Sequence, residues 1–127
     1  MQRTIVTNNP AVWDKYSANA LFIEGSAEQV LIRVRDMVHQ GYELISHPLP
    51  ASLRIMFSPY RSVIIGEKRG AADHLEAEIA EESIWKYRQK MSSREIDAGN
   101  NADYRLIDLL LLDAALKEDQ GGGQPPG

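Results

Sequence analysis

Cysteine is absent from this chain of 127 residues. The chain therefore carries no disulfide, no thiolate metal site and no cysteine nucleophile or redox relay of its own. Long apolar runs are also missing, because the longest block, Leu109–Leu112, is far shorter than the roughly 20 residues that span a bilayer. The N-terminal segment lacks the apolar region of a signal peptide. We expect a cytoplasmic protein that does not bind membranes.

An excess of basic residues is lacking as well, since the formal net charge is -4 and the isoelectric point is about 5.3. Proteins that bind nucleic acids rely on a basic surface, so nucleic-acid binding is not expected. The three histidines, His39, His47 and His74, do not have metal-ligand spacing, and no nucleotide-binding fingerprint is present. The sequence thus predicts neither a metal site nor a cofactor.

The length and the 43% content of hydrophobic residues suit one compact domain. We assign residues 1–118 to a single α/β domain, and residues 119–127, which are rich in glycine and proline, to a flexible C-terminal tail. Short apolar runs between turn residues predict four strands in the domain. These runs are Thr4–Thr7, Ala20–Glu24, Leu44–Ser46 and Ser62–Gly66.

Helical signals separate most of these strands. Asn9 suits the cap of a helix over Pro10–Tyr16, with proline in the first turn. Ser26 opens a capping box and a helix that should stop at Gly41, a residue that tolerates positive φ. Apolar residues at helical spacing predict the two remaining helices, over Ala72–Met91 and Asp103–Leu116.

Alternating strands and helices predict a three-layer open α/β sheet, mainly parallel, with about four strands and flanking helices, similar to half of a Rossmann fold. The exception is the connection before the fourth strand, where Pro48, Pro50 and Pro59 leave no room for a full crossover helix. The direction of the fourth strand therefore stays open.

The helix over Asp103–Leu116 is apolar nearly all round, which is typical of a buried helix. One side of it can lie against the sheet and the other against a second subunit. A homodimer through this C-terminal helix is therefore a hypothesis.

In open parallel sheets, ligands bind beyond the carboxyl ends of the strands. Polar residues follow all four predicted strands. We expect those after the first three strands to converge on one edge of the sheet, which we call the rim. The residues after the fourth strand join them only if that strand is also parallel. Candidate ligand-binding residues at these ends and in the adjoining loop are Asn8, Asn9, Ser26, Ser46, Arg61 and Lys68.

Charge supports an anion at this rim. Residues 47–72 contain four basic residues and the single acid Glu67, so this segment has a net charge of +3. The rest of the chain has a net charge of -7, and the two sum to the total of -4. Basic side chains beside helix N-termini suit a carboxylate or a phosphate. The plainer alternative is that these lysines and arginines are simply solvated.

His47 follows the third strand and is the candidate catalytic residue, because a histidine titrates near neutral pH and can act as a general acid or base. The alternatives are a hydrogen bond to the loop backbone or simple exposure. The sequence offers no paired acid and base and no nucleophile signature beside His47.

Several segments together are familiar: TNNP, FIEGSAEQVLIRVRDMVHQGYELISHPL, SPYRSVII, EESIWKY and YRLIDLLLLDAAL. Over residues 4 to about 116 the chain resembles the GrdX family, small proteins encoded beside the glycine, sarcosine and betaine reductase systems of amino-acid-fermenting bacteria. The resemblance implies an accessory protein of such a system. It brings no established reaction or catalytic residue.

Two functions follow as expectations. The first is an accessory or regulatory protein that binds a small anionic metabolite, or a component of the glycine, sarcosine or betaine reductases, at the rim. The second is a small hydrolase or transferase that acts on an acyl or phosphoryl compound through His47. Glycine reductase chemistry uses selenol and thiol groups, so this chain, which has no cysteine, is not expected to be a redox carrier for it. We favour the first function, since catalysis needs a nucleophile or a paired acid and base, and the rim offers one histidine and isolated serines.

Overall fold

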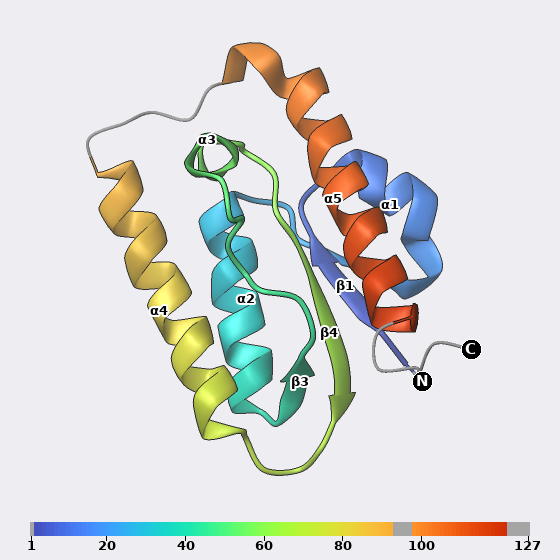
Figure 1. Cartoon of the computed structure of the whole chain (residues 1–127), viewed down its shortest axis with the longest axis vertical. Coiled ribbons are helices and arrows are strands. Elements are labelled where there is room, and N and C mark those ends of the chain that lie inside the picture. The colour runs from blue at the N-terminus through green and yellow to red at the C-terminus, as the bar shows by residue number, and fades with distance from the viewer. Residues whose placement is uncertain (1, 93–97, 122–127) are drawn as a thin grey trace.

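The computed structural model describes residues 2–92 and 98–121. Its centre is one sheet in the order β2-β1-β4-β3 (Figure 1). β1 is parallel to β2, whereas β4 is antiparallel to both of its neighbours, β1 and β3. The strands are β1 (Thr4–Thr7), β2 (Ala20–Phe22), β3 (Tyr42–Leu44) and β4 (Ser62–Lys68).

The prediction of a mainly parallel sheet is wrong, because only one of its pairs is parallel. β1, β2 and β3 do point the same way, but β4 enters between β1 and β3 in the opposite direction. A parallel return would need a crossover, usually a helix. The connection after β3 contains only the four-residue α3 (Leu53–Met56), so the chain stays at one end of the sheet and β4 starts there.

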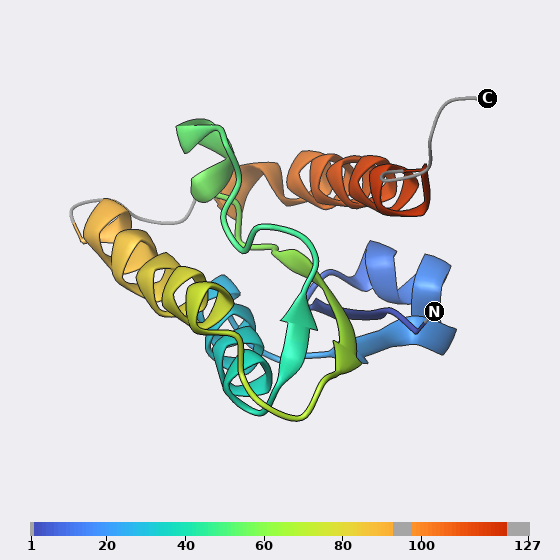
Figure 2. The same ribbon diagram turned by 60° about the horizontal axis from the view of Figure 1, so that its bottom comes forward.

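The predicted α/β layers are present. α1 (Pro10–Tyr16) and α5 (Asn101–Gly121) cover one face of the sheet, and α2 (Ala27–His39) and α4 (His74–Met91) cover the other (Figure 2). Alternation along β4 supplies both cores: Ile64 packs with α1 and α5, whereas Val63 and Ile65 face α2 and α4. The short 3₁₀ turns η1 (Ser17–Asn19) and η2 (Ala98–Asn100) precede β2 and α5.

The predicted helix signals at three positions are confirmed. The Asn9 side chain accepts a hydrogen bond from the Ala11 N–H at 3.0 Å and so caps α1. Ser26 makes both bonds of the capping box at the start of α2. Gly41 follows α2 with a φ of 104°, in the left-handed region that favours glycine.

α5 is less buried than its composition predicts. Leu112 is its only buried residue, on the side that packs against α1 and β4. The opposite side exposes 54% of Leu106 and 56% of Leu110. Leu111, between the two sides, is 50% exposed and lines the cavity described below. One side of α5 thus packs within the chain, and the burial of its other side by a second subunit stays a prediction. Leu75 on α4 is likewise 67% exposed.

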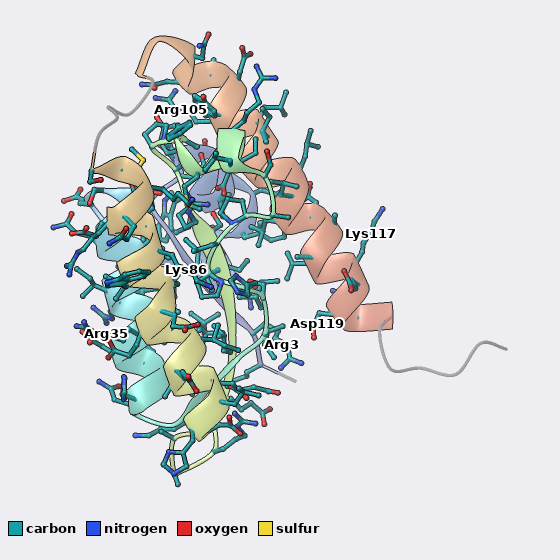
Figure 3. The ribbon with its side chains drawn as sticks, turned by 60° about the vertical axis from the view of Figure 1, so that its left-hand side comes forward. Arg3, Arg35, Lys86, Arg105, Lys117 and Asp119 are labelled. Carbon is teal, nitrogen blue, oxygen red and sulfur yellow. The ribbon has the colours of Figure 1, made fainter. Side chains whose placement is uncertain are left out.

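α5 continues to Gly121, three residues past the domain boundary expected at 118. Near the end of α5, Asp119 accepts a hydrogen bond from Arg3 Nε at 2.6 Å (Figure 3). Because Arg3 directly precedes β1, this bond connects the end of the last helix to the start of β1. Residues 122–127 of the expected tail lie outside the described part of the chain. Over residues 2–92 and 98–121, none of the helices is long and apolar enough to cross a membrane.

Candidate functional site

Buried polar side chains gather at the end of the sheet where β1 stops and β4 begins. The register places Thr7 opposite Ser62, and their hydroxyl oxygens lie 2.7 Å apart. Ser62 Oγ donates to Asp108 Oδ2 at 2.7 Å, and Asn9 Nδ2 donates to the same oxygen at 2.9 Å. This network connects the two central strands of the sheet to α5.

Asp108 is largely withdrawn from water within this network. Burial raises its pKa above the ordinary range of a carboxyl group. The hydrogen bonds from Asn9 and Ser62, and the positive charge of Arg61, oppose that rise. Both side-chain hydrogen bonds fall on Oδ2, so α5 presents a partly satisfied carboxyl group to the end of the sheet.

Arg61 precedes β4 and is only 4% exposed. Its Nε and Nη2 atoms are buried and have no hydrogen-bond partner among the described residues. Burial lowers the pKa of the guanidinium, while the attraction of Asp108 opposes this effect. Nε and Nη2 form one edge of the guanidinium, the fork that grips a carboxylate or a phosphate with two parallel hydrogen bonds.

A cavity of about 110 Å³ lies beside these two charged groups. At about 30 Å³ per water molecule it has room for about four waters. Its polar wall comes from β3, β4 and α5 or their flanking loops, and its apolar wall comes mainly from α5 and the loop before α3. The polar lining residues are Ser46, His47, Arg61, Ser62 and Asp108.

A family model described as GrdX-like protein matches residues 4–117. The chain belongs to the GrdX-like family. This match confirms the resemblance found in the sequence motifs, and it spans every residue that lines the cavity at Arg61. No curated protein and no solved structure matches the chain.

Asn8 and Asn9 of this GrdX-like chain lie at the site, as predicted, but their amides are occupied by the protein. Asn8 Nδ2 donates to the carbonyls of Gly25 and Pro59 at 3.0 and 2.8 Å, and Asn8 Oδ1 accepts from the Arg61 N–H at 2.9 Å. Asn8 therefore joins three loops. Asn9 caps α1 and binds Asp108, so both asparagines position the site.

The two serines and the histidine predicted for the rim differ in their surroundings. Ser26 is exposed, and its hydroxyl caps α2. Ser46 lines the cavity, where its Oγ accepts from the Ile64 N–H at 2.8 Å and extends the contact of the β3 edge with β4. His47 is exposed at the cavity mouth, and its Nδ1 lies 3.0 Å from the donating Leu49 N–H.

Lys68 is not brought to this site. Because β4 is antiparallel, its last residues lie at the far end of the sheet, where Lys68 pairs in register with Tyr42, the first residue of β3. Arg69 is also held there, since its Nη2 lies 2.9 Å from Glu76 Oε1. The basic segment is thus divided between the two ends of the sheet. Lys68 was expected at the rim only if the fourth strand was parallel, and this condition is not met.

Sequence reasoning missed Asp108, Ser62 and Thr7 as members of the site. Asp108 had a detectable signal, because it is one acid within the apolar run LIDLLLL, on a helix predicted to be buried. Buried carboxylates need hydrogen-bond partners. Ser62 had no such signal, since a serine at the start of a strand is common in any turn.

Proposed function

We propose that this chain is an accessory protein of a glycine-type amino-acid reductase system, and that it binds a small carboxylate metabolite at the cavity beside Arg61. Family membership supports the association with such a system. The observation that carries the binding proposal is the buried edge of Arg61, whose Nε and Nη2 atoms have no hydrogen-bond partner within residues 2–92 and 98–121. The absence of cysteine assigns the thiol and selenol chemistry to other components of the system.

A buried guanidinium without hydrogen bonds is an unfavourable arrangement, because each unsatisfied buried donor costs about 1 to 3 kcal/mol and a charged donor costs more. Asp108 offsets part of this cost by attraction, yet it forms no hydrogen bond with Arg61. An anion in the adjoining cavity restores what is missing. A rotation of the guanidinium toward the cavity brings the Nε and Nη2 fork onto the ligand carboxylate.

The size of the cavity, 110 Å³, limits the ligand to about four to six non-hydrogen atoms. The second charged group favours a ligand that also carries a cation, because the Asp108 carboxyl lines the same cavity as Arg61. A small amino acid such as glycine has both groups, and its ammonium would stabilise the ionised form of Asp108. Acetate provides the carboxylate alone, and inorganic phosphate provides an anion of another shape.

The test is the thermal and urea stability of the protein with glycine, acetate or phosphate at equal concentrations. A ligand present at about 100 times its dissociation constant adds about 2.7 kcal/mol. We expect glycine to stabilise the wild type most, and to have no effect on Arg61→Met. Arg61→Lys keeps a charge without the fork and should bind more weakly. Unchanged stability of the wild type with all three ligands, or an equal shift in Arg61→Met, contradicts the proposal.

The alternative of a hydrolase or transferase finds no specific support at His47, because none of the described serine hydroxyls hydrogen-bonds to its ring. His47→Ala separates the two functions, since the side chain is exposed and the variant should fold. We expect this variant to keep ligand binding. A reductase component is the second partner that the family association suggests, and a pull-down of purified components with the wild type and Arg61→Met, with and without glycine, tests that part.

A further inference from the structure

The outward face of α5 is a row of side chains that the described parts of the chain leave uncovered. Leu106 and Leu110 are each more than half exposed, whereas Leu111, which is 50% exposed, lies on another side of the helix and lines the cavity beside Arg61. At about 100° per residue, Leu106 and Leu110 lie on the side of α5 opposite the buried Leu112. Exposed leucines gathered on one helix face mark an interaction surface. Figure 2 shows this face of α5 pointing away from the sheet and from α1.

We propose that this face binds the same face of a second copy of the chain, with the two α5 helices antiparallel. The row consists of exposed residues separated by three, four, four and three positions, and this spacing is the same in both directions about Leu110. A twofold axis at Leu110 therefore places Leu106 of each copy against the small Ala114 of the other. The row is Asp103, Leu106, Leu110, Ala114 and Lys117.

Charge selects the second copy as the occupant. The row ends in an acid, Asp103, on one side and a base, Lys117, on the other, and neither forms a salt bridge within the described residues. Lys117 points outward from α5 (Figure 3). Antiparallel pairing sets Asp103 of each copy opposite Lys117 of the other, which makes two attractive pairs. Parallel pairing would set like charges together.

The contact is small. From Asp103 to Lys117 the row is about 21 Å long, so one helix pair lies below the roughly 1,200 Å² typical of stable complexes. We expect a reversible dimer with a dissociation constant in the range of about 10 to 100 μM. This surface faces away from the guanidinium of Arg61, so the dimer does not depend on the proposed ligand.

Sedimentation equilibrium from about 5 to 500 μM tests the association. We expect the wild type to change from monomer to dimer over this range and Leu110→Glu to stay monomeric. Leu75→Glu is the matched control, because Leu75 is 67% exposed on α4, on the other face of the sheet, and this variant should dimerise as the wild type does. A wild type that remains monomeric at 500 μM, or forms only larger species, overturns the proposal.

Charge exchange tests the antiparallel register. Asp103→Lys and Lys117→Asp each place like charges opposite one another and should weaken self-association about tenfold at low salt. A mixture of the two variants should form a heterodimer at wild-type concentrations, because both of its charge pairs are attractive. Failure of the mixture to associate, when each variant remains folded, contradicts this register.

Cross-linking gives an independent answer because the chain has no native cysteine. Leu110→Cys places two thiols near the twofold axis and should form a disulfide-linked dimer under mild oxidation. Asp103→Cys is the control, since its two thiols would lie about 21 Å apart in the antiparallel pair, beyond disulfide reach. Efficient cross-linking at position 103 instead of 110 indicates parallel helices and refutes the arrangement.

Discussion

Replacing Arg61 by methionine should stabilise the unliganded protein. Arg61 is only 4% exposed. Its buried Nε and Nη2 atoms form no hydrogen bond within the described residues that would replace the hydrogen bonds they make to water in the unfolded chain. Methionine has a similar length, fills the same space and has no polar atom to desolvate. Replacement of a whole buried ion pair by apolar residues is often neutral or raises stability by about 1 to 4 kcal/mol, and the Nε and Nη2 atoms of Arg61 have no hydrogen-bonded partner among the described residues that their removal would leave unsatisfied.

Two structural features limit the gain. Arg61 attracts Asp108, whose pKa would rise further without it, and methionine does not reproduce the planar shape of the guanidinium. We therefore expect the free energy of unfolding of Arg61→Met to exceed that of the wild type by about 1 to 3 kcal/mol. In a domain of this size the melting temperature should rise by about 3 to 10 °C.

Urea unfolding at pH 7, followed by circular dichroism, measures this difference. Arg54→Met is the matched control, because Arg54 is exposed on α3 and its replacement should change stability by less than about 0.5 kcal/mol. A loss of more than about 1 kcal/mol in Arg61→Met would show that the guanidinium is well satisfied in the free protein. The proposal that the unpaired Nε and Nη2 atoms bind an anion would then fail.

Two further variants test the surroundings of the site and a turn distant from it. Burial raises the folded-state pKa of Asp108 above the unfolded value, so the contribution of this carboxyl to stability is complete below the unfolded pKa and is lost as pH rises through the folded pKa. The stability gain of Asp108→Asn over the wild type, measured by urea unfolding, should therefore grow between about pH 4 and 8. A difference that stays constant over this range contradicts the prediction. Gly41→Ala should be more destabilising than Gly70→Ala by at least about 1 kcal/mol in thermal unfolding. Both glycines have a positive φ, of 104° and 93°, but only a Cβ at Gly41 would lie 2.6 Å from the Gly70 carbonyl oxygen. Equal losses of stability would mean that backbone strain alone, without this close contact, sets the cost.

Local chemistry made these helix boundaries predictable. Asn9, Ser26 and Gly41 act through their own backbone neighbours, so their roles are fixed within a few residues of sequence. The direction of β4 is different, because it depends on where a 17-residue connection leads the chain, and the prolines in it exclude a helix without specifying a path. That one ambiguity removed Lys68 from the site.

The asparagines show a second limit. TNNP correctly indicated a turn at the end of the sheet, but the sequence does not reveal whether an amide faces a ligand or another loop. Asn8 and Asn9 use their amides on Pro59, Arg105 and Asp108, partners 51 to 99 residues away. Arg61 was identified from its charge, whereas its lack of a partner becomes visible only when the surrounding atoms are placed.

The contacts of α5 set an order on the folding of this chain. Three acids of the last helix bind residues near the start of the chain: Asp108 binds Asn9, Asp113 binds Lys15 and Asp119 binds Arg3. The Lys15–Asp113 and Arg3–Asp119 pairs are separated by 98 and 116 residues in the sequence. During synthesis the strands and α2 leave the ribosome long before these acids do, so Arg61 must spend that interval without Asp108. Contacts between such distant residues also form slowly. The cavity beside Arg61 is therefore the last part of the domain to exist, and a nascent chain that stops before α5 lacks the helix that forms one of its walls.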